Sequence, residues 1–125
     1  MKLLLDTHLL LWWLDDSPSL PQPARVLIAQ PENTIFVSAV TIWEIWLKVS
    51  LGKLRLPAGF EAQLAAEGFE NLPVTAAHAR HTERLPWLHR DPFDRMLVAQ
   101  AAVSGLTLLS ADKLLAPYGP MVHIV

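Results

Sequence analysis

The chain contains 125 residues with a formal net charge of −2, and 52% of its residues are hydrophobic whereas only 18% are charged. This composition excludes intrinsic disorder as the main state, and the absence of cysteine excludes disulfide scaffolds, thiolate metal sites and cysteine nucleophiles. The longest apolar run, residues 9–14, is far shorter than the roughly 18 residues that a membrane-spanning helix needs. Asp6 also interrupts the N-terminal leucine run, which argues against a secretory signal peptide. We therefore expect a single domain, residues 1–125, that is cytoplasmic and has no membrane partner.

The predicted elements alternate between strands and helices along the whole chain. The first half is expected to contain a strand at 2–5, helices at 7–14 and 21–29, a strand at 34–37, and helices at 38–51 and 58–67. The second half is expected to contain a weak strand at 69–74, helices at 75–85 and 92–104, and strands at 106–109 and 121–125. Short apolar strands without alternation predict an α/β fold with a parallel sheet covered on both faces.

Acidic residues occur near the predicted ends of the strands. Asp6 follows the first strand, and Glu44 lies in the helix after the second strand. Asp91 and Asp94 flank the start of the helix at 92–104, and Asp112 follows the fourth strand. Carboxylates that converge at the ligand-binding edge of a sheet repel one another, and a hard cation such as Mg²⁺ or Mn²⁺ relieves that repulsion. The pattern predicts a metal site where an activated water attacks a phosphodiester.

Each acid also has a purely structural interpretation. Asp6 and Asp91 stand directly before predicted helices and have the side chain of a good N-cap, and proline follows Asp91. Thr41 and Glu44 match a capping box, which requires the helix to begin at Thr41 instead of after Ser38. The residue patterns alone leave both interpretations open.

Other chemistries fit the sequence less well. There is no glycine-rich phosphate loop, no GxSxG nucleophile elbow and no closely spaced histidine pair. His78 and His81 share a polar helix face and are expected to be solvated. A dehalogenase-like phosphatase needs a second aspartate two residues after the first. This chain has His8 at that position, so it lacks the general acid of that class. The main alternative is a receiver-like or non-catalytic metal-binding module that acts through partners, although the third strand ends without an acceptor aspartate.

Four sequence blocks resemble PIN-domain ribonucleases of the VapC toxin type. They are residues 3–14 (LLLDTHLLLWWL), 37–45 (VSAVTIWEI), 89–101 (HRDPFDRMLVAQA) and 109–112 (LSAD). The blocks follow the order of that family and span nearly the whole chain. The resemblance implies a single PIN domain with a three-layer fold around a five-stranded parallel sheet. It also implies a Mg²⁺- or Mn²⁺-dependent endoribonuclease that acts on RNA, forms a homodimer and is neutralised by a cognate antitoxin.

The resemblance assigns the catalytic and metal-binding roles to an acidic quartet. It implies that this quartet consists of Asp6, Glu44, Asp94 and Asp112, with Asp6 and Asp94 binding the metal most directly. The other two acids are expected to complete the pocket through water or with a second metal. Because the net charge is −2, the metal would supply the positive charge that meets a phosphate.

Four further residues receive expected roles beside this quartet. Thr7 and Ser110 are expected to orient water or phosphate, with serine standing where many family members have threonine. Arg95 is expected to pair with an acid or, as the weaker expectation, to contact the RNA backbone. Asp91 is expected either to cap its helix or to support a second metal.

The chain has five tryptophans, whose roles the sequence does not separate: Trp12, Trp13, Trp43, Trp46 and Trp87. We expect most of them to pack in the core, because large aromatic side chains dominate core burial. The alternative is a partly exposed apolar groove, which in the resembled family would accept a segment of the antitoxin. Trp43 and Trp46 are three residues apart and therefore share one helix face.

Overall fold

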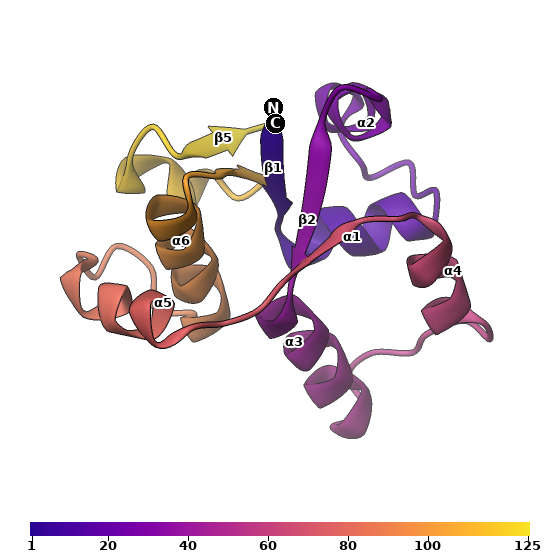
Figure 1. Ribbon diagram of the computed structural model, residues 1–125. Coiled ribbons are helices and arrows are strands. Elements are labelled where there is room, and N and C mark those ends of the chain that lie inside the picture. Colours follow the sequence, from indigo (N-terminus) through magenta and orange to yellow (C-terminus); the bar gives the residue numbers. More distant parts are fainter.

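A five-stranded parallel sheet forms the centre of the molecule in the computed structural model, which describes residues 1–125 (Figure 1). Its strands are β1 (Lys2–Leu5), β2 (Thr34–Ser38), β3 (Glu70–Leu72), β4 (Thr107–Ser110) and β5 (Val122–Ile124). They lie in the order β3-β2-β1-β4-β5, and every neighbouring pair is parallel. The predicted α/β class and parallel sheet are confirmed.

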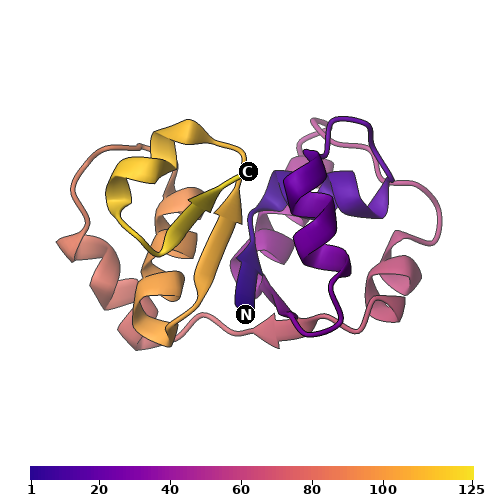
Figure 2. The ribbon, with the colours of Figure 1, turned by 90° about the horizontal axis from the view of Figure 1, so that it is seen from above.

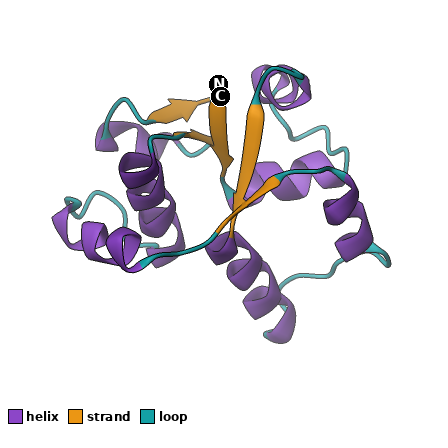
Figure 3. Ribbon diagram, in the orientation of Figure 1, coloured by secondary structure: helices purple, strands orange, loops and turns teal.

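Helices connect the strands and cover both faces of the sheet, as the secondary-structure colours of Figure 3 show. The α-helices are α1 (Thr7–Leu14), α2 (Gln22–Ala29), α3 (Ala39–Ser50), α4 (Phe60–Ala66), α5 (Ala76–His81) and α6 (Pro92–Ser104). Two 3₁₀ helices are η1 (Thr82–Arg84) and η2 (Lys113–Tyr118). Helices α1, α2 and α4 lie on one side of the central strands, and α5 and α6 lie on the other (Figure 1 and Figure 2). None of these helices has the length and hydropathy that crossing a membrane requires.

The central strand β1 contributes to two separate cores. Because successive strand residues point to opposite faces, Leu3 and Leu5 pack with Leu10 of α1, whereas Leu4 packs with Leu97 of α6. All five side chains are fully buried. Burial on both faces explains why the N-terminal run is continuously apolar instead of alternating.

Three predicted elements divide or differ by two or more residues at one end in the structure. The helix expected at 58–67 begins only after Gly59, whose φ of 81° is left-handed and interrupts helical geometry. The helix expected at 75–85 divides into α5 and η1, where the Leu85 N–H bonds the Thr82 carbonyl with the three-residue spacing of a 3₁₀ turn. The strand expected at 69–74 contracts to β3.

His78 is buried, so the expectation that it is solvated is wrong. Its Nδ1 accepts a hydrogen bond from the Thr75 N–H at 3.1 Å, which closes a capping box at the start of α5. Its Nε2 lies 2.8 Å from the hydroxyl of Ser104 at the end of α6. The histidine therefore ties α5 to α6.

The strand order reverses direction at β1, which pairs with β2 on one side and with β4 on the other. In parallel sheets, ligands bind beyond the carboxyl ends of the strands at such a reversal. Asp6 immediately follows β1, and Ser110 is the last residue of β4. The topology therefore brings Asp6 and Ser110, which are distant in sequence, to one crevice.

Candidate metal centre

Asp6 lies at the base of this crevice, with only 4% of its surface exposed. One carboxylate oxygen accepts a hydrogen bond from the Leu9 N–H at 2.8 Å, so Asp6 caps α1 as its sequence position predicts. The other oxygen accepts a hydrogen bond from the Ser110 hydroxyl at 2.5 Å. Burial raises the pKa of Asp6, and the charge of Asp112 raises it further, against the lowering by these hydrogen bonds and by His8.

The start of α3 decides where Glu44 lies on its helix. The Ser38 hydroxyl accepts a hydrogen bond from the Val40 N–H at 3.0 Å, so α3 begins at Ala39 and the capping box at Thr41 is not formed. Glu44 consequently lies inside the helix instead of at its end. The interpretation of Glu44 as a capping residue is therefore wrong.

Glu44 is buried, and both of its carboxylate oxygens have partners. The Thr7 hydroxyl donates to Oε1 at 2.6 Å, and the Lys48 ammonium donates to Oε2 at 2.6 Å. Thr7 belongs to α1, directly after Asp6, so this bond links the first helix to α3. The contacts fix the Glu44 carboxylate next to the end of β1.

Asp94 lies in the first turn of α6 and is half-buried. Its pKa is raised to about 7, first by burial and then by the negative charge of Asp91, with smaller increases from Asp6 and Glu44. The neighbouring His89 acts in the opposite direction and lowers this pKa. The carboxylates of Asp6 and Glu44 therefore lie near enough to Asp94 to influence its pKa.

Asp112 approaches this region from the other side of the crevice. Its Oδ1 accepts a hydrogen bond from the Leu114 N–H at 3.0 Å and caps η2, while its own N–H donates to the Ser110 hydroxyl at 3.0 Å. Its Oδ2 lies 3.1 Å from Nε2 of His89. The side chain is partly exposed, so solvent reaches this acid more readily than Asp6 or Glu44.

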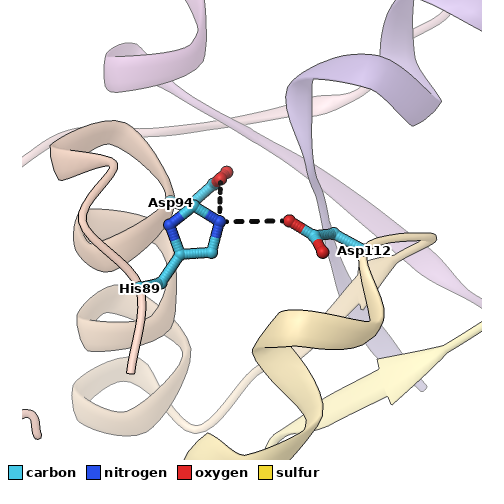
Figure 4. A group of neighbouring side chains, drawn as sticks. All are labelled: His89, Asp94 and Asp112. Atoms are coloured by element: carbon cyan, nitrogen blue, oxygen red, sulfur yellow. Dashed lines mark hydrogen bonds and ion pairs between the residues drawn. The ribbon is translucent and has the colours of Figure 1, made fainter. Parts of the chain in front are cut away.

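His89 is the site residue that sequence reasoning missed. Figure 4 shows its ring between Asp94 and Asp112, with Nε2 3.4 Å from Asp94 Oδ2 and 3.1 Å from Asp112 Oδ2. Atoms of these three side chains that are able to bind a metal lie within 4.8 Å of one another. No other histidine lies close to His89 in the sequence. Its position at the head of the block 89–101 is the only sequence signal.

Asp91 caps α6, which confirms the structural interpretation of this residue. Its side chain accepts a hydrogen bond from the Phe93 N–H at 2.8 Å. Its main-chain N–H donates to Nδ1 of His89 at 3.0 Å, so the same residue also orients that ring. A role of Asp91 in a second metal site stays a prediction.

Arg95 is placed differently from both expectations. It lies about 100° around α6 from Asp94, so it faces the preceding loop instead of the acids. Its guanidinium is buried, donating to the carbonyls of Pro86 and Thr82, each at 2.9 Å, and to the Tyr118 hydroxyl at 3.2 Å. The Trp87 ring covers the guanidinium at 3.8 Å. The expected pairing with an acid is wrong, and burial removes Arg95 from the residues available to bind RNA.

Comparison with known proteins identifies the family. The PIN domain profile matches residues 3–118. The chain belongs to the PIN-domain family. A search of curated proteins found no match. PIN domains are generally nucleases that use divalent metals, and the acidic cluster agrees with this chemistry.

Solved structures of toxin–antitoxin complexes contain chains with the same fold. A chain of the Rickettsia felis VapBC2 complex bound to a promoter DNA fragment aligns with a TM-score of 0.73 and 16% identity, covering 100% of this chain and 98% of that chain. A chain of a Klebsiella pneumoniae toxin–antitoxin complex aligns with a TM-score of 0.64 and 20% identity, covering 98% of each chain. A chain of DNA-bound VapBC from Salmonella typhimurium aligns with a TM-score of 0.64 and 18% identity, covering 100% of this chain and 97% of that chain. At these identities the likeness establishes the fold.

The donor set of this PIN domain fits a hard divalent cation. The converging ligand atoms are mainly carboxylate oxygens, which Mg²⁺ and Mn²⁺ prefer. Asp6 and Glu44 have hydrogen-bond partners on both oxygens, yet each carboxylate oxygen has two lone pairs and keeps one for a metal. A cation would also offset the mutual repulsion that raises the pKa of Asp94.

Thr7 and Ser110 contact acids of the PIN domain site. Thr7 orients Glu44, and Ser110 donates to Asp6 while accepting the N–H of Asp112. Both side chains are buried. Their direct effect is therefore to orient carboxylates, and contact with water or phosphate stays a prediction.

None of the five tryptophans is fully buried, so the expectation that most pack in the core is wrong. Trp43, Trp46 and Trp87 are exposed, whereas the two tryptophans of α1 are half-buried against the core. A groove of about 420 Å³ runs beside the site and is lined by 15 residues, among them Thr7, Trp12, Ile45, Lys48 and Phe60. Of the five tryptophans, only Trp12 lines the groove beside the site, so a role of the exposed tryptophans in binding an antitoxin stays a prediction.

Proposed function

We propose that this PIN domain is a metal-dependent endoribonuclease toxin of a toxin–antitoxin pair. It hydrolyses phosphodiester bonds of RNA with a metal-activated water. The observation that carries the proposal is the convergence of Asp94, Asp112 and His89, whose metal-binding atoms lie within 4.8 Å of one another. The Ser110 hydroxyl links Asp6 to the main chain of Asp112 beside them. Carboxylates from separate elements crowd into one pocket, which costs stability unless a cation binds there. The family and the fold shared with chains of VapBC complexes support the same function.

The four acids have two different roles in binding the metal, Mg²⁺ or Mn²⁺. Asp6 and Asp94 would hold it directly, and Glu44 and Asp112 would complete the site through water or with a second metal. When bound, the metal supplies the Lewis acidity that lowers the pKa of a water molecule and polarises the phosphodiester. Asp94 gives up its proton on binding, which its pKa near 7 allows at neutral pH.

The remaining residues of the pocket hold these acids in place. Ser110 donates to Asp6, and Thr7 and Lys48 together hold Glu44. This preorganisation lets the carboxylates bind a cation without rearranging. Because the protein carries a net charge of −2, RNA affinity should depend on the divalent ion more than on the protein's own basic residues.

We propose that the partner is a cognate antitoxin and that the toxin acts in the cytoplasm as a homodimer. The groove beside the site combines apolar side chains such as Trp12 and Phe60 with the charged Lys48. It opens next to Thr7, so an occupant of the groove lies beside Glu44. An antitoxin segment bound there would block the pocket, and a basic side chain would pair with the acids.

A cleavage assay with matched variants tests the proposed activity. Single-stranded and structured RNA are incubated with the purified protein in Mg²⁺, in Mn²⁺ or in EDTA. Asp6→Asn and Asp94→Asn each remove one ligand charge at nearly constant volume, and Glu32→Gln removes an exposed carboxylate far from the site. Cleavage should require a divalent ion, persist in Glu32→Gln and disappear in both aspartate variants. Equal cleavage by wild type and both aspartate variants would overturn the assignment and leave a non-catalytic metal-binding module.

A further inference from the structure

We infer that His89 is a positioning residue, an inference that rests on the proposed metal-dependent function. Its Nε2–H holds the Asp94 and Asp112 carboxylates in place for the cation, and the ring is not itself a ligand. The three side chains form the bridged group in Figure 4.

The main chain at Asp91 sets the tautomer of the His89 ring. The Asp91 N–H donates to Nδ1 at 3.0 Å, and a nitrogen that accepts a hydrogen bond carries no hydrogen. The ring hydrogen therefore lies on Nε2. That nitrogen faces two acceptors, Oδ2 of Asp112 at 3.1 Å and Oδ2 of Asp94 at 3.4 Å.

This tautomer opposes direct metal binding by the ring. A metal at Nε2 needs the lone pair of that nitrogen, so the ring hydrogen would have to move to Nδ1. It would then point at the Asp91 N–H, placing two donors against each other. The geometry instead matches the indirect role in which a side chain orients the metal-binding carboxylates.

The loop that carries the ring is held by contacts that do not involve the acids. The main-chain N–H of His89 donates to the Tyr118 hydroxyl at 3.0 Å, and that hydroxyl also accepts a hydrogen bond from Arg95 at 3.2 Å. Arg95 further binds the Pro86 carbonyl at 2.9 Å. The loop that carries His89 is therefore anchored to α6 and η2.

The bridge joins the two sides of the pocket. Asp94 belongs to α6 and Asp112 to the segment after β4, so no main-chain hydrogen bond fixes their separation. The ring N–H hydrogen-bonds Oδ2 of Asp112 and lies 3.4 Å from Oδ2 of Asp94, so its positive end attracts both carboxylates and offsets part of their repulsion. Oδ1 of Asp112 accepts the Leu114 N–H and Oδ2 faces the histidine, so each oxygen keeps one lone pair for a cation.

Metal titration of two His89 variants of the full chain tests this role. His89→Leu removes the donor, whereas His89→Gln offers an amide N–H at a comparable reach. Calorimetry gives the Kd for Mn²⁺ and for Ni²⁺, and thermal melting in EDTA verifies that each variant is folded. We expect His89→Leu to raise the Kd for both ions by the same factor, about 10-fold or more. His89→Gln should recover part of the lost affinity.

The other outcomes separate the alternatives. A direct ligand would make His89→Leu lose much more affinity for Ni²⁺ than for Mn²⁺, because Ni²⁺ prefers imidazole nitrogen, and this would overturn the inference. Unchanged Kd values would overturn it in favour of a purely structural role. Absence of Mn²⁺ binding by the wild type would instead overturn the proposed function itself. If the variants do not fold, long-range ¹H–¹⁵N NMR of the metal-free wild type reads the tautomer, and a hydrogen on Nδ1 contradicts the inference.

Discussion

The Ser110 hydroxyl donates a hydrogen bond to the Asp6 carboxylate across 2.5 Å, joining residues 104 positions apart in the chain. The same hydroxyl oxygen accepts the N–H of Asp112. One small side chain therefore couples the ends of β1 and β4 and sets the positions of two acids. The effect of the Ser110 side chain on stability and on metal binding is measurable without any substrate.

Ser110→Ala should weaken both the fold and the metal site. The change leaves a buried carboxylate oxygen of Asp6 without its donor, which costs about 1–3 kcal/mol in the free energy of unfolding. Urea denaturation in EDTA measures this loss, and calorimetry should show weaker Mn²⁺ binding. Ser110→Thr keeps the hydroxyl and should restore Mn²⁺ binding, while Ser19→Ala changes an exposed serine as a control. Wild-type stability and metal affinity in Ser110→Ala would refute the coupling.

The metal-free protein should lose stability as the pH rises. Asp94 has a folded pKa of about 7 against 3.8 in the unfolded chain, so the folded state binds its proton more tightly. Its stabilising contribution is complete below pH 3.8 and is lost as the pH rises through about 7. The raised pKa of Asp6 acts in the same direction. Urea midpoints in EDTA at about pH 5 and about pH 8 should therefore differ.

Asp94→Asn isolates this contribution, because the amide does not titrate. The variant should show a smaller decrease in stability between the two pH values and should be more stable than wild type at the higher one. Glu32→Gln, at an exposed position, should keep the wild-type slope. Equal slopes in wild type and Asp94→Asn would show that Asp94 does not carry the pH dependence.

The sequence predicted the local geometry of the site well. Asp6, Ser38 and Asp91 cap the helices that follow them, because a short polar side chain before a helix satisfies a free N–H wherever the fold places it. The ends of β1, β2 and β4 also followed, to within one residue, from the pattern of apolar runs. A parallel sheet then brings those ends to one edge, so convergence of the acids required only the topology.

The parts that were missed depend on contacts distant in sequence. His89 enters the pocket because Tyr118, 29 residues later, holds its loop. Arg95 turns toward main-chain carbonyls that its own sequence neighbours do not reveal, whereas the adjacent Asp94 suggested an ion pair. The exposure of Trp43 depends on which face of α3 remains uncovered. A one-dimensional pattern carries no information about which loop covers a given helix face.

Arg95→Met should release the loop that carries His89. The substitution keeps much of the apolar stem but leaves several carbonyls without a donor, which should lower the free energy of unfolding by roughly 1–3 kcal/mol. Arg95→Lys should not restore it, since one ammonium cannot reproduce the planar array of donors. Urea denaturation gives the loss, and hydrogen exchange should accelerate at His89. Arg84→Met is the exposed control, and the same loss in both variants would contradict a specific anchoring role.

Lys48→Met should make the protein depend more strongly on a divalent ion. Glu44 is buried, and removing the ammonium at 2.6 Å leaves its charge with only the Thr7 hydroxyl as partner. Because Lys48 is partly exposed, we expect a loss of about 1 kcal/mol in EDTA. A cation bound at the acids replaces the missing positive charge, so saturating Mn²⁺ should raise the Tm of Lys48→Met more than that of wild type. Lys53→Met removes a charge from the same groove without an ion pair to Glu44, and it should show the wild-type shift. Equal Mn²⁺-induced shifts in Lys48→Met and wild type would mean that the cation does not share the charge of Glu44.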